Sequence, residues 1–285
     1  MQLGEALRLG TAFLARSGEI GSPRRDAEEL LRDALSLTRL ELYLQFERPL
    51  TDGELTRIRD LLRRRRQQEP MAYLLGEVEF HGLEIRVVAG ILIPRPESEL
   101  LVELALAQID KLGPGPTTVA DLGCGSGCLG IAIAAAAPEA TIYASDVSEI
   151  AAATTRQNAK KNGVGDRVTV TQSSWASGMA ATGPLQVVVA NPPYVTSAEL
   201  DTLDRSVRDF EPRLALDGGP DGLTCYRELG ADLVTAVAPG TAILLEGDPR
   251  RLEAVAALMA HTWPQAGLTI HKDTAERDRV LEVLI

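Results

Sequence analysis

The stretch that decides the fold is Val119-Ala120-Asp121-Leu122-Gly123-Cys124-Gly125-Ser126-Gly127, which is followed by the apolar run 129–137. The short apolar segment before the glycines predicts a buried strand, and the longer apolar run predicts a helix. Three alternating glycines let the backbone of the connecting turn pass close to a ligand without side-chain obstruction. The spacing lacks the Lys-Ser/Thr end of a phosphate-binding loop and is a poor dinucleotide fingerprint. The sequence therefore predicts a ligand-binding loop between a strand and a helix. Its spacing argues against a nucleoside triphosphate and against a dinucleotide as the ligand.

Two acidic residues make this ligand loop more specific. Asp121 precedes the glycines, where its carboxylate would repel a pyrophosphate but attract an amino group. Asp146 ends the next predicted strand, where a carboxylate can accept both hydroxyls of a ribose. With Gly123, Gly125 and Gly127 they favour S-adenosylmethionine, which carries a cationic amine and an unphosphorylated ribose. The alternative is that Asp121 caps a loop and that Asp146 is a solvated strand end.

Strand signals continue on both sides of the ligand loop, and helical patterns separate most of them. The predicted strands are 117–122, 141–145, 168–172, 185–190, 241–246, 268–271 and 280–284. This alternation predicts an α/β protein whose largely parallel sheet is covered by helices on both faces.

The N-terminal region follows a different pattern. Apolar residues recur there at helical spacing, and Thr51 and Glu54 are spaced as a capping box, which predicts a small helical bundle. The bundle contains no obvious catalytic constellation, so we expect it to recruit a substrate. Alternating residues around His81-Gly82 predict a β-hairpin linker. The expected division is a helical domain at 1–74, a hairpin linker at 75–92 and a catalytic domain at 93–285.

The predicted strand 185–190 ends in Asn191-Pro192-Pro193-Tyr194. An amide nitrogen is a poor nucleophile because its lone pair is delocalised into the carbonyl. The side-chain oxygen of Asn191 and the backbone carbonyl of Pro192 can accept hydrogen bonds from both N–H groups and orient such a nitrogen. Pro192 and Pro193 stiffen the turn, and Tyr194 offers a ring for stacking a planar amide, guanidine or base. Ordinary turn chemistry explains the isolated tetrapeptide, but its place in the same sheet as the ligand loop favours an N-methyltransferase active site.

The chain resembles the release factor glutamine methyltransferases, a branch of the class I S-adenosylmethionine-dependent methyltransferases, over nearly its whole length. Besides the Asn191–Tyr194 turn, the resemblance is carried by Leu92-Ile93-Pro94-Arg95-Pro96-Glu97-Ser98-Glu99 and by the segments 211–223 and 272–280. It implies a seven-stranded, mostly parallel Rossmann-like methyltransferase sheet with a helical N-terminal domain and a hairpin linker. The implied reaction is methylation of N5 of the glutamine in the Gly-Gly-Gln loop of peptide chain release factors.

The resemblance also implies roles for the parts around the turn. The helical domain would touch the release factor, and Arg95, Glu97 and Ser98 would help to form the substrate and cofactor site. On other grounds Arg95 is explained as a surface charge and Ser98 as a helix-start residue.

Two segments depart from the family's pattern. Ser173-Ser174-Trp175 lacks the acid that many relatives use to contact the adenine amino group, so Trp175 is expected to flank the adenine, with core filling as the alternative. Glu246-Gly247-Asp248-Pro249-Arg250 replaces the usual Glu-Ile-Gly-Tyr. The departures leave two acceptors open, a release-factor glutamine or a free small molecule with an amide or guanidine nitrogen.

Composition restricts the remaining classes of function. The 285 residues are 45% hydrophobic and 24% charged, which is typical of a cytoplasmic enzyme with a buried core, and the net charge of −11 argues against DNA as the main ligand. No stretch approaches the roughly 20 apolar residues of a membrane span. Cys124, Cys128 and Cys225 are expected to be reduced thiols without a metal site. The run 63–66 of four arginines is either a solvated helix face or a docking patch.

Overall fold

The computed structural model describes residues 1–177 and 185–285, which divide into two compact units. The helical unit contains Met1–Glu77 and Asp204–Phe210, and the sheet unit contains Val78–Leu203 and Glu211–Ile285. The segment 204–210 therefore groups with the N-terminal helices, although no pattern in the sequence indicated this. The division into three expected ranges stays a prediction.

The helical unit buries one apolar face of each of its main helices. Leu14, Leu30 and Leu31 are fully buried in a common core, as the helical spacing of apolar residues predicted. The capping box is also confirmed, because Thr51 accepts a hydrogen bond from the Glu54 backbone N–H while the Glu54 carboxylate accepts one from the Thr51 N–H. The helices are α1 (Leu3–Ala15), α2 (Pro23–Leu35), α3 (Arg39–Leu44), α4 (Asp52–Arg66), α5 (Met71–Leu75) and α9 (Arg205–Arg208).

The sheet unit is built on a seven-stranded sheet of order β5-β4-β3-β6-β7-β9-β8. Among the described strands, β9 runs antiparallel to its neighbours β7 and β8, and the other paired strands are parallel. All predicted strands are present, although β7 begins earlier than predicted. Their bounds are β3 (Thr117–Leu122), β4 (Ala140–Asp146), β5 (Val168–Gln172), β6 (Leu185–Ala190), β7 (Val237–Glu246), β8 (Gly267–Lys272) and β9 (Asp278–Leu284).

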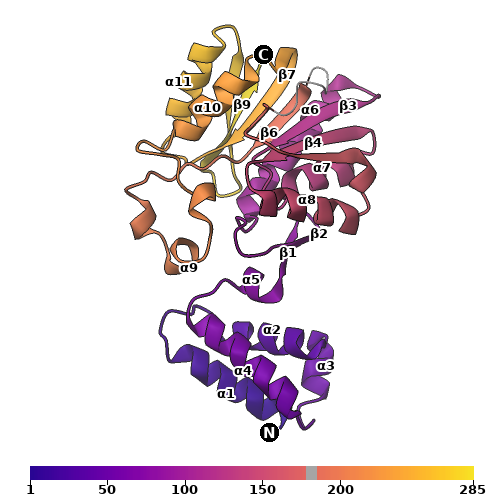
Figure 1. Cartoon of the computed structure of the whole chain (residues 1–285), viewed down its shortest axis with the longest axis vertical. Coiled ribbons are helices and arrows are strands. Elements are labelled where there is room, and N and C mark those ends of the chain that lie inside the picture. The colour runs from indigo at the N-terminus through magenta and orange to yellow at the C-terminus, as the bar shows by residue number, and fades with distance from the viewer. Residues whose placement is uncertain (178–184) are drawn as a thin grey trace. The chain divides into compact units, whose positions relative to one another are not determined.

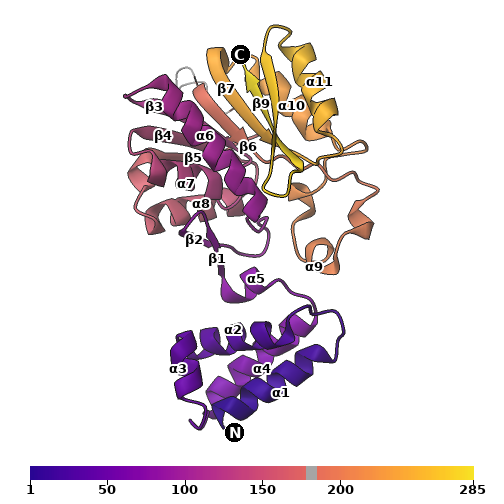
Figure 2. The same ribbon diagram turned by 180° about the vertical axis from the view of Figure 1, so that it is seen from behind.

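Helices cover both faces of the sheet (Figures 1 and 2). Residues of α6 (Glu99–Leu112), α7 (Cys128–Ala136) and α8 (Glu149–Lys161) join the core cluster on one face, and residues of α10 (Thr224–Leu233) and α11 (Leu252–Thr262) join the cluster on the other. Within β6, Val187 and Val189 belong to the first cluster and Val188 and Ala190 to the second, because successive side chains of a strand point to opposite faces. Burial on both faces explains why the strands read as continuous apolar runs.

A two-stranded hairpin precedes the first helix of the sheet unit. Its strands are β1 (Glu77–Phe80) and β2 (Leu83–Arg86). His81 and Gly82 between them both have positive φ, 49° and 73°, as the tight hairpin turn predicted from the sequence requires. Phe80 and Ile85 are buried in the first core cluster, so the hairpin is packed against the sheet unit rather than free.

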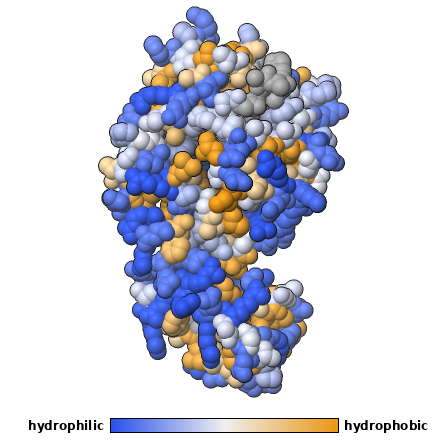
Figure 3. Space-filling view, in the orientation of Figure 1, coloured by the Kyte–Doolittle hydropathy of each residue, from blue (hydrophilic) through white to orange (hydrophobic). Residues whose placement is uncertain are grey.

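The surface in the view of Figure 3 is largely hydrophilic, with hydrophobic residues exposed in separate places. Over residues 1–177 and 185–285, no helix is both long enough and apolar enough to cross a membrane.

The capping box of α4 gives a prediction for stability. Thr51→Ala removes the hydroxyl that accepts from the Glu54 N–H, and we expect it to lower the free energy of unfolding by about 1 kcal/mol in urea titrations. The matched control is Thr56→Ala in the same helix, where the exposed hydroxyl only donates to the Asp52 carbonyl. Alanine is the better helix former there, so the control should be neutral or slightly stabilising. Equal losses in the two variants would contradict the cap.

Candidate functional site

A cavity of about 230 Å³ in the sheet unit opens beside the C-terminal ends of the central strands. Ligands of doubly wound sheets bind at this edge, where the strand order reverses direction, and here that point lies between β3 and β6. Five of the site residues predicted from the sequence lie outside the lining of the cavity: Asp121, Gly127, Glu97, Pro192 and Tyr194. The predicted site residues that do line it are Arg95, Ser98, Gly123, Gly125, Asp146, Trp175, Asn191 and Pro193.

Strand register explains why residues so far apart in sequence meet at this cavity. Leu122 of β3 pairs with Ser145 of β4 and with Ala190 of β6, and Ala190 pairs in turn with Leu245 of β7. The residues that follow these four therefore form one row across the edge of the sheet. The row is Asp146, Gly123, Asn191 and Glu246.

The glycine turn after β3 is closely packed from behind. Gly127 has φ 79°, and a Cβ there would lie 2.5 Å from Cγ2 of Thr155 on α8. A Cβ on Gly123 would lie 3.4 Å from the Trp175 ring. Gly123 and Gly125 therefore keep the cavity open, whereas Gly127 lets the turn pack against α8.

The Asp121 carboxylate is buried behind this turn, with 1% of the residue exposed. Its Oδ2 accepts a hydrogen bond from the Gly130 N–H at 2.9 Å, and its Oδ1 has no hydrogen-bond partner in the described part of the chain. Burial raises the pKa of Asp121 to about 7, and the nearby Asp146 carboxylate adds to the rise. A buried carboxylate oxygen without a partner is costly, so this position favours a cation.

Asp146 connects β4 to the glycine turn. Its Oδ2 accepts from the Gly125 N–H at 2.9 Å and its Oδ1 from the Ser148 N–H at 2.8 Å, and it lines the cavity. Each carboxylate oxygen has a second acceptor site, so Asp146 can still accept two hydroxyl groups. Burial raises the pKa of Asp146.

The Asn191 side chain is held through its amide nitrogen. Asn191 Nδ2 donates to Ser98 Oγ at 3.2 Å, and the Ser98 hydroxyl donates to Glu246 Oε2 at 2.6 Å. Ser98 ends the short helix η1 (Pro96–Ser98), and both Ser98 and Glu246 are buried. Sequence reasoning identified Asn191 and Ser98 but gave Glu246 no role, because only strand register places it next to them.

The rest of the turn is supported by a glycine segment. A Cβ on Gly218 would lie 2.7 Å from the Pro193 carbonyl oxygen, and one on Gly222 would lie 2.5 Å from the Tyr194 carbonyl oxygen. Glycine is therefore needed for this backbone to approach the turn. The Tyr194 ring packs against the core cluster shared with α10 and α11, and burial raises the pKa of Tyr194 to about 12.

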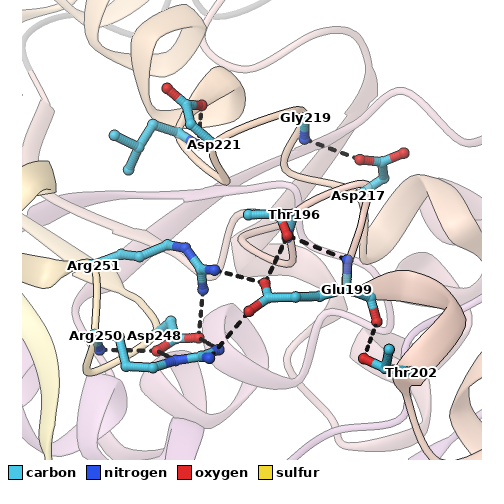
Figure 4. A network of polar contacts seen from close by, with 10 residues as sticks. Thr196, Glu199, Thr202, Asp217, Gly219, Asp221, Asp248, Arg250 and Arg251 are labelled. Atoms are coloured by element: carbon cyan, nitrogen blue, oxygen red, sulfur yellow. Dashed lines mark hydrogen bonds and ion pairs between the residues drawn. The ribbon is translucent and has the colours of Figure 1, made fainter.

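A network of charged groups fixes the chain that leaves the turn (Figure 4). The Glu199 carboxylate accepts from the backbone and hydroxyl of Thr196 and from Arg251 at 2.6 Å, and Arg251 also donates to Asp248 at 2.7 Å. Arg250 pairs with both acids. The hydrogen bond from Arg251 lowers the pKa of Glu199 to about 2. Sequence reasoning missed this network because its acids and arginines lie on distant segments.

Arg95 lines the cavity and is anchored by a buried acid. Glu211 accepts from the Ile93 N–H at 3.0 Å and pairs with the Arg95 guanidinium through its other oxygen. Glu97 instead pairs with Arg277 at 3.5 Å, outside the lining of the cavity. Glu211 was visible in the sequence only as the first residue of a segment quoted for the resemblance.

Trp175 closes another side of the cavity. Its Nε1 donates to Glu228 Oε2 at 3.3 Å, and its backbone carbonyl accepts from the Ser145 hydroxyl at 2.6 Å. Trp175 has φ 38°, which is uncommon for a bulky residue, and these contacts keep its backbone in place. Glu228 also lines the cavity and was not singled out from the sequence.

The cysteines of the sheet unit are free thiols, of which Cys124 and Cys128 are buried. Burial raises the pKa of Cys128 to about 12, so this thiol is a weak nucleophile. Outside the gap at 178–184, no group of three His, Cys, Asp or Glu residues is placed to hold a metal ion.

The sheet order, glycine turn and edge cavity define a Rossmann-like methyltransferase. A family model described as "Methyltransferase small domain" matches residues 98–219. The catalytic domain of hMettl16, solved in complex with a MAT2A 3′UTR hairpin, shares the fold with a TM-score of 0.58 at 14% identity, covering 82% of each chain.

The particular family is identified by similarity that extends over nearly the whole chain. A family model described as "PrmC N-terminal domain" matches residues 5–76. A release factor glutamine methyltransferase of Rhodopirellula baltica is 36% identical over 96% of this chain and 93% of its own, and one of Deinococcus radiodurans is 37% identical over 98% and 97%. The chain belongs to the release factor glutamine methyltransferase family.

The packing of the glycine turn gives a second prediction. Gly127→Ala should lower the free energy of unfolding by more than the roughly 1–2 kcal/mol of a left-handed alanine, because its Cβ would also collide with Thr155. Gly76→Ala is the matched control, since Gly76 has nearly the same backbone angles (φ 80°, ψ 0°) and nothing within 4 Å of the added Cβ. Denaturant titration compares the two variants. A loss at Gly127 no larger than that at Gly76 would rule out the packing argument.

Proposed function

We propose that this protein transfers the methyl group of S-adenosylmethionine to N5 of the glutamine side chain in the Gly-Gly-Gln loop of peptide chain release factors. The observation that carries the proposal is that Asn191 lines the cavity beside the glycine turn and has its side-chain nitrogen tied to Ser98, which leaves the amide oxygen as the acceptor. The family membership and the coverage of nearly the whole length of the relatives support the acceptor.

The residues around the glycine turn fit S-adenosylmethionine. When bound, this cofactor supplies a methyl group on a sulfonium, which is reactive towards a nitrogen lone pair. We propose that the negative charge of Asp121, whose Oδ1 lacks a partner among the described residues, favours the cationic amine. Asp146 would accept the ribose hydroxyls and Trp175 would flank the adenine, while Gly123, Gly125 and Gly127 leave the turn free of side chains.

The acceptor site is proposed around Asn191. Its Oδ1 would accept one N–H of the substrate amide and the Pro192 carbonyl the other, which orients the nitrogen and disperses the positive charge that develops on it. No general base is required before transfer, because the proton can leave afterwards. Pro193 and Tyr194 would stiffen and flank the turn, and Arg95 and Ser98, which line the cavity, would close the site. Glu97 lies outside the lining, so its expected part in the site stays a prediction. The stacking role of Tyr194 stays a prediction.

The helical unit is proposed to contact the release factor. It contains the "PrmC N-terminal domain" region, and the cavity described above is lined by residues of the sheet unit. Because release factors act on ribosomes, we propose the cytoplasm as the place of the reaction.

Replacing Asn191 tests the acceptor site and the function together. Labelled S-adenosylmethionine is incubated with the enzyme and a release factor, with a release factor whose loop glutamine is replaced, and with a panel of amino acids and small amides. We expect label only in the intact release factor, and about 100-fold slower transfer by Asn191→Ala with unchanged cofactor affinity. Labelling of small amides but not of the protein would contradict the proposed acceptor, and wild-type turnover by Asn191→Ala would remove Asn191 from the mechanism.

The raised pKa of Asp121 predicts how cofactor binding depends on pH. Below about pH 7 the carboxyl of the free protein is protonated, and a cationic amine favours the ionised form. Affinity should therefore rise with pH by up to about tenfold per unit below this pKa, with release of a proton. Calorimetry between pH 6 and 8 measures both effects, and Asp121→Asn should abolish the dependence. The same slope in Asp121→Asn would disprove the assignment.

A further inference from the structure

Three polar side chains form a chain of hydrogen bonds that starts in the cavity and ends in the core. Asn191 Nδ2 donates to Ser98 Oγ at 3.2 Å, and Ser98 donates to Glu246 at 2.6 Å. Glu246 is 1% exposed and lies outside the lining of the cavity, so it does not reach a bound acceptor. Its backbone carbonyl accepts from the buried Tyr226 hydroxyl at 2.6 Å, which holds the end of β7 in place.

When Glu246 is ionised, the direction of both hydrogen bonds between these three side chains is fixed. A carboxylate only accepts, so the single Ser98 proton must point towards Glu246. Ser98 Oγ then has only lone pairs to offer to Asn191, and it must meet the amide NH₂ group rather than the amide oxygen. A flipped Asn191 amide would oppose two oxygen lone-pair regions and lose the hydrogen bond.

Resting on the proposed function, we propose that Glu246 is a positioning residue that acts through Ser98 to fix the polarity of the Asn191 amide, so that its oxygen is presented to the N–H of the acceptor. Without these hydrogen bonds the two flipped orientations of the Asn191 amide, which have nearly the same shape, would compete. Only one orientation offers an acceptor oxygen to the substrate. The other would place the Asn191 NH₂ group against the NH₂ group of the substrate amide.

The surroundings of Glu246 act on its charge in both directions. Burial raises the pKa of Glu246 and the Glu97 carboxylate adds to the rise, whereas the hydrogen bond from Ser98 and the charges of Arg279 and Arg95 oppose it. Arg279 itself is held by Asp273 at 3.3 Å, and Arg95 by Glu211. Arg279 and Arg95 are thus paired with other acids, and Glu246 Oε2 accepts its hydrogen bond from the Ser98 hydroxyl.

Kinetics of variants test whether Glu246 acts through Asn191. In Glu246→Gln the side-chain NH₂ can donate to Ser98, which frees the Ser98 proton to face Asn191, and Ser98→Ala removes the link. We expect both to lower kcat about 10-fold or more with unchanged cofactor affinity, whereas Ser98→Thr keeps the hydroxyl and should lower kcat by much less than Ser98→Ala. In the Asn191→Ala background, Glu246→Gln should lower kcat by less than about twofold.

The matched control is Glu282→Gln, which makes the same change at another carboxylate of the sheet unit. Glu282 accepts from Gln108 at 2.7 Å and lies against His271 on β8, away from the cavity. Its kcat should stay at the wild-type value. A wild-type kcat in folded Glu246→Gln, or a loss that adds in full to that of Asn191→Ala, overturns the proposal.

A spectroscopic readout separates this inference from the identity of the acceptor. With ¹⁵N-labelled asparagine, the Asn191 side-chain NH₂ signals are assigned by their absence in Asn191→Ala. We expect them to shift in Glu246→Gln and Ser98→Ala, and to stay near their wild-type position in Ser98→Thr and Glu282→Gln. If the enzyme fails to label a release factor while these shifts occur, the proposed function fails and the positioning role stands. Unchanged signals in Glu246→Gln refute the positioning role whatever the acceptor.

Discussion

The site depends on the register of four parallel strands. Because Leu122, Ser145, Ala190 and Leu245 lie in one hydrogen-bonded row, the residue after each of them emerges at the same edge of the sheet. The glycine turn beside the cavity, the acid proposed to bind the ribose, the amide proposed to meet the acceptor and the acid behind that amide are thus neighbours by construction. A shift of one residue in any strand would exchange its two faces and remove its contribution from the row.

Short-range features of this protein were predictable from its sequence. The buried strands, the Gly123–Gly127 turn and the capping box at Thr51 each follow from residues within a few positions of one another, where steric and hydrogen-bonding rules apply directly. The acids that hold Ser98 and Arg95 were not, since Glu246 and Glu211 approach them only after the sheet forms. For the same reason nothing in the sequence indicated that 204–210 would group with the N-terminal helices.

The departures from the family pattern fall on different sides of the site. Asp248 and Arg250 lie outside the cavity lining. Arg250 and Arg251 pair with Glu199, which follows the Asn191–Tyr194 turn, and Asp248 pairs with both arginines. This departure therefore lies in the network that supports the turn and outside the lining of the cavity. Ser174 does line the cavity, next to Trp175, on the side proposed for the adenine. Neither departure gives a physical reason to replace a protein glutamine by a free small molecule.

Three buried carboxylates lie outside the lining of the cavity, and the groups around them differ in a way that bears on function. Glu211 is paired with Arg95, and Glu246 accepts from Ser98. Asp121 has one backbone donor, and the described residues provide no partner for its Oδ1. Burying a carboxylate is costly unless its charge is compensated, and burial raises the pKa of Asp121 to about 7. A cationic ligand would remove part of this cost on binding, whereas Glu211 is already paired with Arg95 and Glu246 already accepts from Ser98. The unsatisfied acid is therefore the one suited to ligand binding, and the two satisfied acids are suited to holding Arg95 and Asn191 in place.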